Sequence, residues 1–308
     1  MNPRKIPRYL AWLVSPALLI GAVTALLLAE RIGWSYGAVT GIVTVFTAII
    51  LVILESRYPL DERWKMTWQS FRRDLKYFAT TGLTIAATSS LFALVGIKLA
   101  NDHQGVASNW PLILAVPAGL FVFDFLQYWQ HRFSHEAKGV IGAWYWRAHV
   151  AHHLPDKVYV AMYPAGHPIN GFVVRGLATI APLYALGFSA QAVAFINLVI
   201  GIVGLISHTN IDLRAGPLNY VLTGSELHRY HHSADPADGG NYAIVLSLID
   251  VMFGTLKYRP GIPPVALGVH NPSAYPSSNA LFEVLKLPFG SARTGPTESQ
   301  ADGIAVRS

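Results

Sequence analysis

Three short stretches of this 308-residue chain are rich in histidine: HRFSH (131–135), HVAHH (149–153) and HRYHH (228–232). Together they hold eight of the twelve histidines in the sequence. Residues three or four apart share one face of a helix, so each stretch directs its imidazoles the same way. An unsatisfied polar group buried beside apolar helices costs roughly 1 to 3 kcal/mol. The clustering therefore indicates metal ligands rather than packing residues.

Composition places these stretches in a membrane protein. The chain is 52% hydrophobic and 13% charged, with a mean hydropathy of +0.37, which favours a polytopic bilayer protein over two soluble domains. It has no cysteine, so disulfides, thiolate metal sites and cysteine nucleophiles are excluded. The net charge of +6 comes mainly from residues beside apolar runs, and no soluble module mixes basic and aromatic residues. No nucleic-acid partner is expected.

Four apolar runs, at 9–29, 36–54, 77–99 and 111–128, are long enough to cross a bilayer. The first is too long for a secretory signal, and the second follows it closely. The connector 55–76 carries six Lys or Arg, whereas the turn at 101–109 carries none. The positive-inside rule then places the N-terminus and the connector in the cytoplasm. Four crossings bring His131 to the same side.

A fifth apolar stretch, 172–207, is interrupted by Pro182, Gly187 and Gly201. Two crossings of a core about 30 Å thick need some 40 residues, so this stretch is slightly short. We expect a helical hairpin or a re-entrant pair that returns His208 to the cytoplasmic side. The predicted fold is an all-α integral membrane protein: about four transmembrane helices, this hairpin or re-entrant pair, and a cytoplasmic helical cap carrying the histidine clusters.

The predicted organisation has three parts. Residues 1–128 form a transmembrane region that includes the connector, and residues 129–260 form a histidine-rich catalytic region that includes the stretch 172–207. Residues 261–308 form a tail, which we expect to be disordered toward its end because it is rich in Gly, Ser, Thr and Pro from about residue 287.

The number of histidines predicts more than one metal ion. Neutral imidazole suits zinc, copper, iron and nickel, and the count is well above four ligands. The HExxH motif of mononuclear zinc hydrolases is absent, and so are the Glu-x-x-His pairs of helical-bundle di-iron proteins. An all-histidine dinuclear site is the simplest interpretation.

The three stretches resemble the HxxxH, HxxHH and HxxHH boxes of the fatty acid hydroxylase and sterol desaturase superfamily, which are integral membrane di-iron oxygenases. The resemblance spans about residues 120–256 and includes other matching positions: Asp124, Tyr128, Trp146–Arg147, His167–Pro168, His208–Asn210, Asn241–Tyr242, Asp250 and Phe253–Thr255. It implies hydroxylation or desaturation of a lipid at an unactivated C–H bond. The implied cofactors are two iron ions, with O2 as co-substrate and two electrons supplied from outside.

The resemblance also implies roles for individual residues. The implied catalytic iron ligands are His131, His135, His149, His152, His153, His208, His228, His231 and His232. His167 is a tenth candidate ligand, although its surroundings, YPAGHP (163–168), depart from the arginine-containing version of the family. Asp124, two helical turns before His131, and Asp250, among apolar neighbours, are expected to support the ligands, as is Asn241. Trp144, Tyr145 and Trp146 are assigned to a membrane-interface belt.

Alternatives remain open at this stage. A desaturase would use the same site, since one oxidant can add oxygen or remove a second hydrogen. A di-zinc membrane hydrolase would accept the histidines but lacks an evident carboxylate base. A transporter would spread its histidines along the spans rather than crowd them at one face. Sterols, fatty acyl chains, sphingoid bases, ether lipids, aminolipids and carotenoids are all candidate substrates.

The electrons require a partner. The sequence has no nicotinamide or flavin fingerprint between a strand and a helix, and no cysteines for an iron–sulfur cluster. We expect a ferredoxin or a small cytochrome with its reductase to dock on the cytoplasmic face, with Arg72, Arg73, Lys76, Lys257 and Arg259 as candidate contacts. The short loops indicate a bacterial inner-membrane protein with its N-terminus and active site in the cytoplasm.

Overall fold

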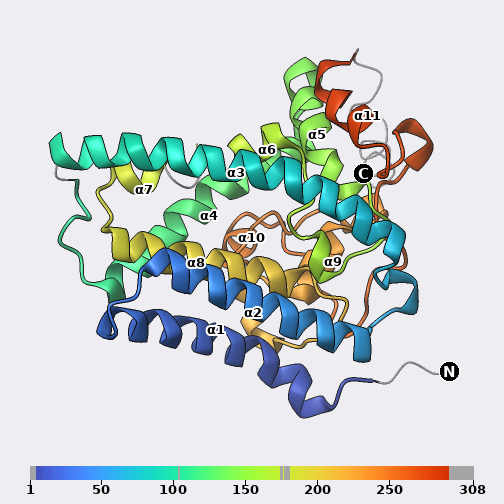
Figure 1. The fold of residues 1–308 in the computed structure, drawn as a ribbon. Coiled ribbons are helices and arrows are strands. Elements are labelled where there is room, and N and C mark those ends of the chain that lie inside the picture. The colour runs from blue at the N-terminus through green and yellow to red at the C-terminus, as the bar shows by residue number, and fades with distance from the viewer. Residues whose placement is uncertain (1–4, 103–104, 174–175, 177–180, 291–308) are drawn as a thin grey trace.

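A computed structural model describes residues 5–102, 105–173, 176 and 181–290 (Figure 1). In this part of the chain all regular secondary structure is helical and there is no strand, as predicted. Its α-helices are α1 (Arg8–Arg31), α2 (Tyr36–Arg57), α3 (Trp68–Asp102), α4 (Leu112–Glu136), α5 (Gly139–His153), α6 (Pro168–Phe172), α7 (Ala181–Ala185), α8 (Ala190–Ser207), α9 (Ser225–His231), α10 (Leu248–Met252) and α11 (Leu281–Lys286). Short 3-10 turns lie between them: η1 (Glu62–Trp64), η2 (Val160–Met162), η4 (Gly216–Tyr220), η5 (Pro236–Asp238), η6 (Pro272–Ala274) and η7 (Leu287–Phe289).

Four of the described helices are long and apolar enough to cross a membrane: Arg8–Ala29, Tyr36–Arg57, Leu112–Glu136 and Ala190–Ser207. They pack side by side, with α8 against α1, α2 and α4, around fully buried Leu26, Leu51 and Leu198 (Figure 1). Three of them coincide with predicted spans. The predicted span 77–99 falls inside α3, a single helix of 35 residues that begins within the connector. The side chains of residues 92–102 lie outside the described set.

The stretch 172–207 forms a hairpin rather than a shallow dip. Helices α6 and α7 lead away from the histidine-rich end, and α8 returns to it (Figure 1). At the turn between α7 and α8, Leu186 O accepts a hydrogen bond of 2.8 Å from Ala107 N in the connection between α3 and α4. The hairpin therefore reaches the end of the bundle opposite the histidines. Residues 174–175 and 177–180 lie outside the described part.

Polar contacts tie the histidine-rich end together. The buried Glu55, near the end of α2, accepts hydrogen bonds of 3.2 Å from the amides of Val160 and Asn210. Asn210 in turn binds the backbone of Asp61 at 3.0 and 2.9 Å. The Arg214 amide donates to Ala11 O in the first turns of α1. The start of α1 and the ends of α2, α4 and α8 thus lie at one end of the bundle, on the same side as His208.

Ordered packing in the C-terminal region extends further along the chain than its composition indicated. Val284 of α11 is fully buried with Tyr77 and Ala151, and η7 forms at the point where disorder was expected to begin. Arg147 Nη1 donates a hydrogen bond of 2.6 Å to Gly290 O. Residues 291–308 lie outside the described part.

The contact between the α3–α4 connection and the α7–α8 turn depends on a glycine. A Cβ at Gly105 would lie 2.4 Å from the backbone carbon and oxygen of Leu186. Gly105→Ala should therefore lower the free energy of unfolding by about 1 to 3 kcal/mol, because backbone must move to admit the methyl group. Thermal unfolding in detergent measures this. Gly41→Ala in α2, with nothing within 4 Å of the new Cβ, is the matched control and should be neutral or slightly stabilising. Equal melting temperatures for the two variants would contradict this packing.

Candidate metal centre

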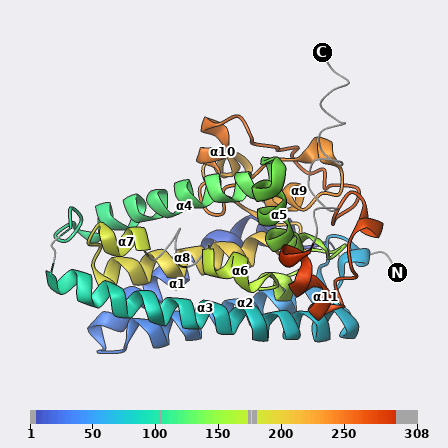
Figure 2. The ribbon, with the colours of Figure 1, turned by 90° about the horizontal axis from the view of Figure 1, so that it is seen from above.

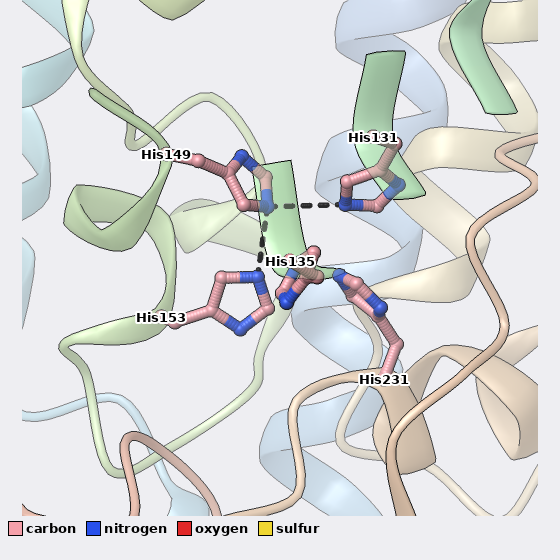
Figure 3. A group of neighbouring side chains, drawn as sticks. All are labelled: His131, His135, His149, His153 and His231. Atoms are coloured by element: carbon pink, nitrogen blue, oxygen red, sulfur yellow. Dashed lines mark hydrogen bonds between the residues drawn. The ribbon is translucent and has the colours of Figure 1, made fainter. Parts of the chain in front are cut away.

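Nine histidines gather into two groups at one end of the bundle. In each group the imidazole nitrogens that could serve as ligands lie within 4.8 Å of one another. The first group is His131, His135, His149, His153 and His231 (Figure 3); the second is His152, His208, His228 and His232. All but His152 are buried, and His152 is half-buried. Every histidine of the three sequence clusters is therefore in one of the groups, and His208 joins them.

Three helices supply the first group. His131 and His135 lie one turn apart on α4, His149 and His153 one turn apart on α5, and His231 comes from α9. His149 Nε2 is 3.0 Å from both His131 Nε2 and His153 Nε2 (Figure 3). Ring nitrogens that approach so closely from separate helices share one small volume, the arrangement a cation requires.

The second group repeats this convergence. His208 follows α8, and its Nε2 is 3.2 Å from His152 Nε2 and 3.0 Å from His228 Nε2. His232 Nε2 lies 3.1 Å from His228 Nε2. The two groups are adjacent, because the rings of His153 and His232 stack with centroids 4.5 Å apart.

The HxxHH motif divides its histidines between the groups. Neighbouring residues on a helix point about 100° apart, whereas positions i and i+4 share a face. On α5, His149 and His153 enter the first group and His152 the second. At α9, His228 and the following cap residue His232 enter the second group and His231 the first. The outer histidines of the motif thus join the first group at α5 and the second group at α9, so both of these HxxHH stretches contribute to both groups.

Backbone carbonyls fix the tautomer of several rings. Nδ1 of His131, His152 and His208 lies 2.7 to 2.8 Å from the carbonyl oxygens of Tyr242, Ala165 and Gly204. A carbonyl can only accept, so each Nδ1 carries the hydrogen and each Nε2 presents its lone pair to the group. His231 Nδ1 likewise donates to Gly240 O at 3.1 Å, and its buried Nε2 has no hydrogen-bond partner among the described residues.

This donor set fits divalent transition metals. Burial, followed by the proximity of other imidazoles, holds the pKa of His149, His153 and His231 well below the usual 6.5. The same causes depress the pKa of His208, His228 and His232. These rings are therefore neutral at physiological pH, the state in which imidazole binds metal. Because the groups that the described residues form contain histidine alone, they suit iron, zinc, copper or nickel rather than calcium or magnesium.

His167 lies outside both groups. Its Nδ1 caps α6 by accepting a hydrogen bond of 3.1 Å from the Ile169 amide, and its Nε2 donates at 3.1 Å to Leu285 O in α11. Both nitrogens are thus used in joining α6 to the C-terminal region. The structure does not bring this candidate ligand to the metal centre.

Asp124 and Asp250 contact backbone amides rather than imidazoles. Asp124 accepts from the amides of Ile244, Val245 and Leu246, and Asp250 accepts from those of Tyr242 and Ala243 at 2.8 and 3.0 Å. The Tyr242 carbonyl is the acceptor for His131. The two carboxylates, expected to support the ligands, therefore do so through the segment 242–246 and not by direct contact.

Asn241 fixes the start of the same segment. Its φ of 54° is the left-handed conformation that Asn tolerates better than most residues. Its side chain donates to the carbonyls of Leu227 and Lys257 at 2.8 and 2.9 Å and accepts from the Lys257 amide at 2.8 Å. Asn241 thus joins α9, which carries His228 and His231, to the chain after α10.

Trp146 is a site residue that the sequence interpretation missed. It is 7% exposed, and its ring lies 5.1 Å from that of His135 and 5.9 Å from that of His153. Its indole nitrogen donates to Tyr275 Oη at 2.8 Å. The assignment of Trp146 to an interface belt is therefore wrong. Its position three residues before His149, on the same helical face, was the available signal.

Comparison with known proteins agrees with this geometry. Residues 116–255 match the family model described as fatty acid hydroxylase. Residues 116–255 form a fatty acid hydroxylase domain. The matched range begins in α4 and ends after α10, so it contains all nine grouped histidines.

Curated relatives come from bacteria and plants. The ornithine lipid hydroxylase OlsE of Rhizobium tropici is 29% identical over 237 residues, which cover 74% of this chain and 70% of the relative. Methylsterol monooxygenase 1-1 of Arabidopsis thaliana is 24% identical, covering 67% of this chain and 69% of the relative. The very-long-chain aldehyde decarbonylase GL1-10 of Oryza sativa subsp. japonica is 23% identical, covering 71% and 74%. No solved structure matches.

The carboxylate contacts generate a prediction. In Asp250→Asn an amide NH2 must face a backbone N–H, so the Tyr242 carbonyl should shift and the orientation of His131 should loosen. Metal affinity should fall by about 10- to 100-fold, the usual effect of losing an outer support of a ligand. Metal titration of the purified apoprotein measures this, with the unfolding midpoint followed in parallel. Asp235→Asn is the control and should bind normally, because the exposed side-chain oxygen that remains can still accept from the Ala237 amide. Wild-type affinity in Asp250→Asn would refute the role.

Proposed function

We propose that this enzyme is a membrane-bound di-iron oxygenase that hydroxylates a C–H bond of a lipid, using O2 and external electrons. The observation that carries the proposal is the convergence of nine histidines into two adjacent groups inside a fatty acid hydroxylase domain. The chain is an oxidoreductase and an integral membrane protein that contains this domain. The identity of the metals, the reaction at carbon and the substrate are the proposed parts.

The protein's contribution is to hold and shield the metals. Each histidine group would bind one ion through the nitrogens that face it. When bound, iron supplies the activation of O2 and the oxidation of the C–H bond. The carbonyls of Tyr242, Ala165, Gly204 and Gly240 keep four of the rings in the tautomer that binds. Burial of the rings keeps bulk water away.

Iron fits this site better than a di-zinc hydrolytic centre. Hydrolysis needs a general base beside the metal-bound water, and the groups found among the described residues contain no carboxylate. Asp124 and Asp250, which lie close by, are engaged with backbone amides. Two of the relatives are named as a hydroxylase and a monooxygenase. Desaturation by the same site is the second candidate reaction, since the ligand set serves both outcomes.

An aminolipid is the first substrate to test. Among the relatives, the ornithine lipid hydroxylase covers 74% of this chain at 29% identity, more than the methylsterol monooxygenase does. We propose a membrane lipid with an acyl chain as the substrate class. An ornithine lipid and a methylsterol should be compared directly as substrates.

The two electrons would come from a separate carrier that docks at the histidine-rich end. Two of the expected contacts are already occupied: Arg73 is 5% exposed and pairs with Asp74 at 2.7 Å, and Arg259 pairs with Asp238 at 2.7 Å. Arg72, Lys76 and Lys257 are exposed. An acidic ferredoxin or small cytochrome is therefore expected to use these three cations, which charge steering makes effective at low salt.

Replacing single histidines tests the metal assignment. His231→Ala and His152→Ala, one from each group, should lose iron and abolish product, because each removes a nitrogen that a metal requires. Elemental analysis of purified protein and mass spectrometry of lipid extracts, with a product heavier by one oxygen, measure the two effects. His270→Ala is the control, since His270 is exposed and outside both groups. Full iron in both variants, or bound zinc with turnover that needs no O2, would contradict the proposal.

The orientation in the membrane is tested separately. We propose that the protein lies in a bacterial inner membrane, with its N-terminus and histidine groups on the cytoplasmic side. The chain has no cysteine, so one introduced cysteine gives one labelling site. Ile32→Cys, at the end away from the histidines, should react with an impermeant maleimide in intact cells. Ala237→Cys, in η5 at the histidine-rich end, should react only after lysis. The reverse pattern would overturn the orientation.

A further inference from the structure

Two short segments beside α4 form one unit, which we call the α10 block: residues 216–221, containing η4, and residues 244–252, containing α10. Two hydrogen bonds join these segments, and a third joins Thr223, two residues after the first segment, to the second. Thr223 N donates to Val245 O at 2.8 Å, Ser247 Oγ donates to Asn219 O at 2.8 Å, and Leu248 N donates to Val221 O at 3.4 Å. The two segments are therefore held as one surface despite their separation in sequence.

The α10 block lies at membrane depth along α4. Asp124, which accepts the amides of residues 244–246, is twelve residues before the end of α4 at Glu136, or roughly 18 Å along the helix axis. Phe253, just after α10, contacts Phe125 and Trp129 with ring centroids 6.2 and 4.9 Å apart. Helix α10 therefore packs alongside α4 (Figure 2), beside the middle and later turns of a helix long enough to span a bilayer.

The outer surface of the block is apolar. Six large side chains are between 42% and 57% exposed: Leu218, Tyr220, Val221, Leu248, Val251 and Met252. The only charged residue of residues 216–221 and 244–252 is Asp250, which is 1% exposed. A contiguous apolar face of this kind, with no charge on it, is typical of a surface covered by lipid or protein rather than by water.

The hydrogen bonding of the backbone favours lipid over water as the cover. Non-helical backbone can lie at bilayer depth only when its polar groups are satisfied within the protein. The five successive amides of residues 242–246 all donate to Asp124 or Asp250. On a water-exposed surface such amides could bind solvent, and two buried carboxylates, each costly to desolvate, would not be needed.

The side chains further along α4 mark where the lipid headgroups begin. Trp129 and Phe133 are each 43% exposed, and they line a surface hollow with Arg132 and Lys138. Aromatic rings followed by cations are the usual sequence at a membrane interface. Asp124 precedes Trp129 by five residues, roughly 7 Å deeper. This places the segment 244–246 on the acyl side of the interface.

We infer that the α10 block inserts among the lipid acyl chains of the leaflet at the histidine-rich end. Its outer face contacts the acyl chains, while the Tyr242 carbonyl next to it holds His131. The region that carries the histidines is thus partly immersed in the leaflet and is not a cap lying wholly in water. The inference rests on packing and hydrogen bonding and does not depend on the metal or the reaction.

Spin labelling tests the insertion in the full-length protein. Met252→Cys and Val221→Cys, each labelled with a nitroxide, are reconstituted into phosphatidylcholine and phosphatidylglycerol vesicles. Relaxation by O2, which partitions into acyl chains, is compared with relaxation by a water-soluble nickel chelate. Phe46→Cys, exposed in the middle of α2, is the lipid reference, and Ala237→Cys in η5 is the aqueous reference.

Both test positions should resemble Phe46→Cys, with strong relaxation by O2 and weak relaxation by the nickel chelate. Two variants are used so that misfolding of one can be recognised by its loss from the monodisperse detergent fraction. Nickel accessibility like that of Ala237→Cys would overturn the inference. Protection from both reagents would overturn it as well, since that result means a protein cover.

Discussion

The structure depends on the desolvation of nine imidazoles at one end of a helical bundle. Each ring must be held neutral, given a fixed tautomer and placed within reach of its neighbours, and no single helix can do this for all nine. Helices α4, α5 and α9 and the end of α8 are therefore brought to one place. The long apolar helices supply the hydrophobic packing that holds these ends together, and the imidazoles occupy the positions where that packing stops.

Backbone carbonyls set the tautomer of four of the nine grouped histidines. A carbonyl accepts but never donates, so it forces hydrogen onto Nδ1 and leaves the Nε2 lone pair free. His131, His152, His208 and His231 each use one. Two of these carbonyls, of Gly240 and Tyr242, lie on either side of Asn241 in its left-handed conformation. The conformation of that one residue therefore helps to direct two rings of the first histidine group.

Much of this arrangement was accessible from the sequence. Apolar runs predicted α1, α2 and α4, and the spacing of HxxxH and HxxHH predicted that the histidines would converge, because periodicity on a helix is a local property. The same periodicity predicted that each stretch would direct its imidazoles one way, whereas the structure divides His152 and His153 between the two groups. The length of the stretch 172–207 also led to the expectation, for a hairpin or a re-entrant pair, that His208 would return to the side of His131.

What could not be predicted depends on contacts between distant segments. His167 carries the same donor atoms as the ligands, and only the packing of α6 against the C-terminal region shows that both its nitrogens are used elsewhere. Tryptophan is a residue type common at membrane interfaces, and only the tertiary fold shows that Trp146 lies against His135. The carboxylates of Asp124 and Asp250 were expected to face imidazoles. They face amides instead, because a segment without regular structure has donors that nothing local can satisfy.

The hydrogen bonds between these carboxylates and backbone amides link the membrane to the metal centre. A carboxylate in the middle of α4 is costly unless several donors surround it, and irregular backbone in lipid is costly unless acceptors surround it. Asp124 and the amides of residues 244–246 remove both costs at once. The segment they stabilise ends at α10 on one side and begins at the Tyr242 carbonyl on the other. The packing that keeps this segment beside α4 is therefore the same packing that keeps His131 directed at its group, so stability in the bilayer and order at the metal centre are not independent properties of this fold.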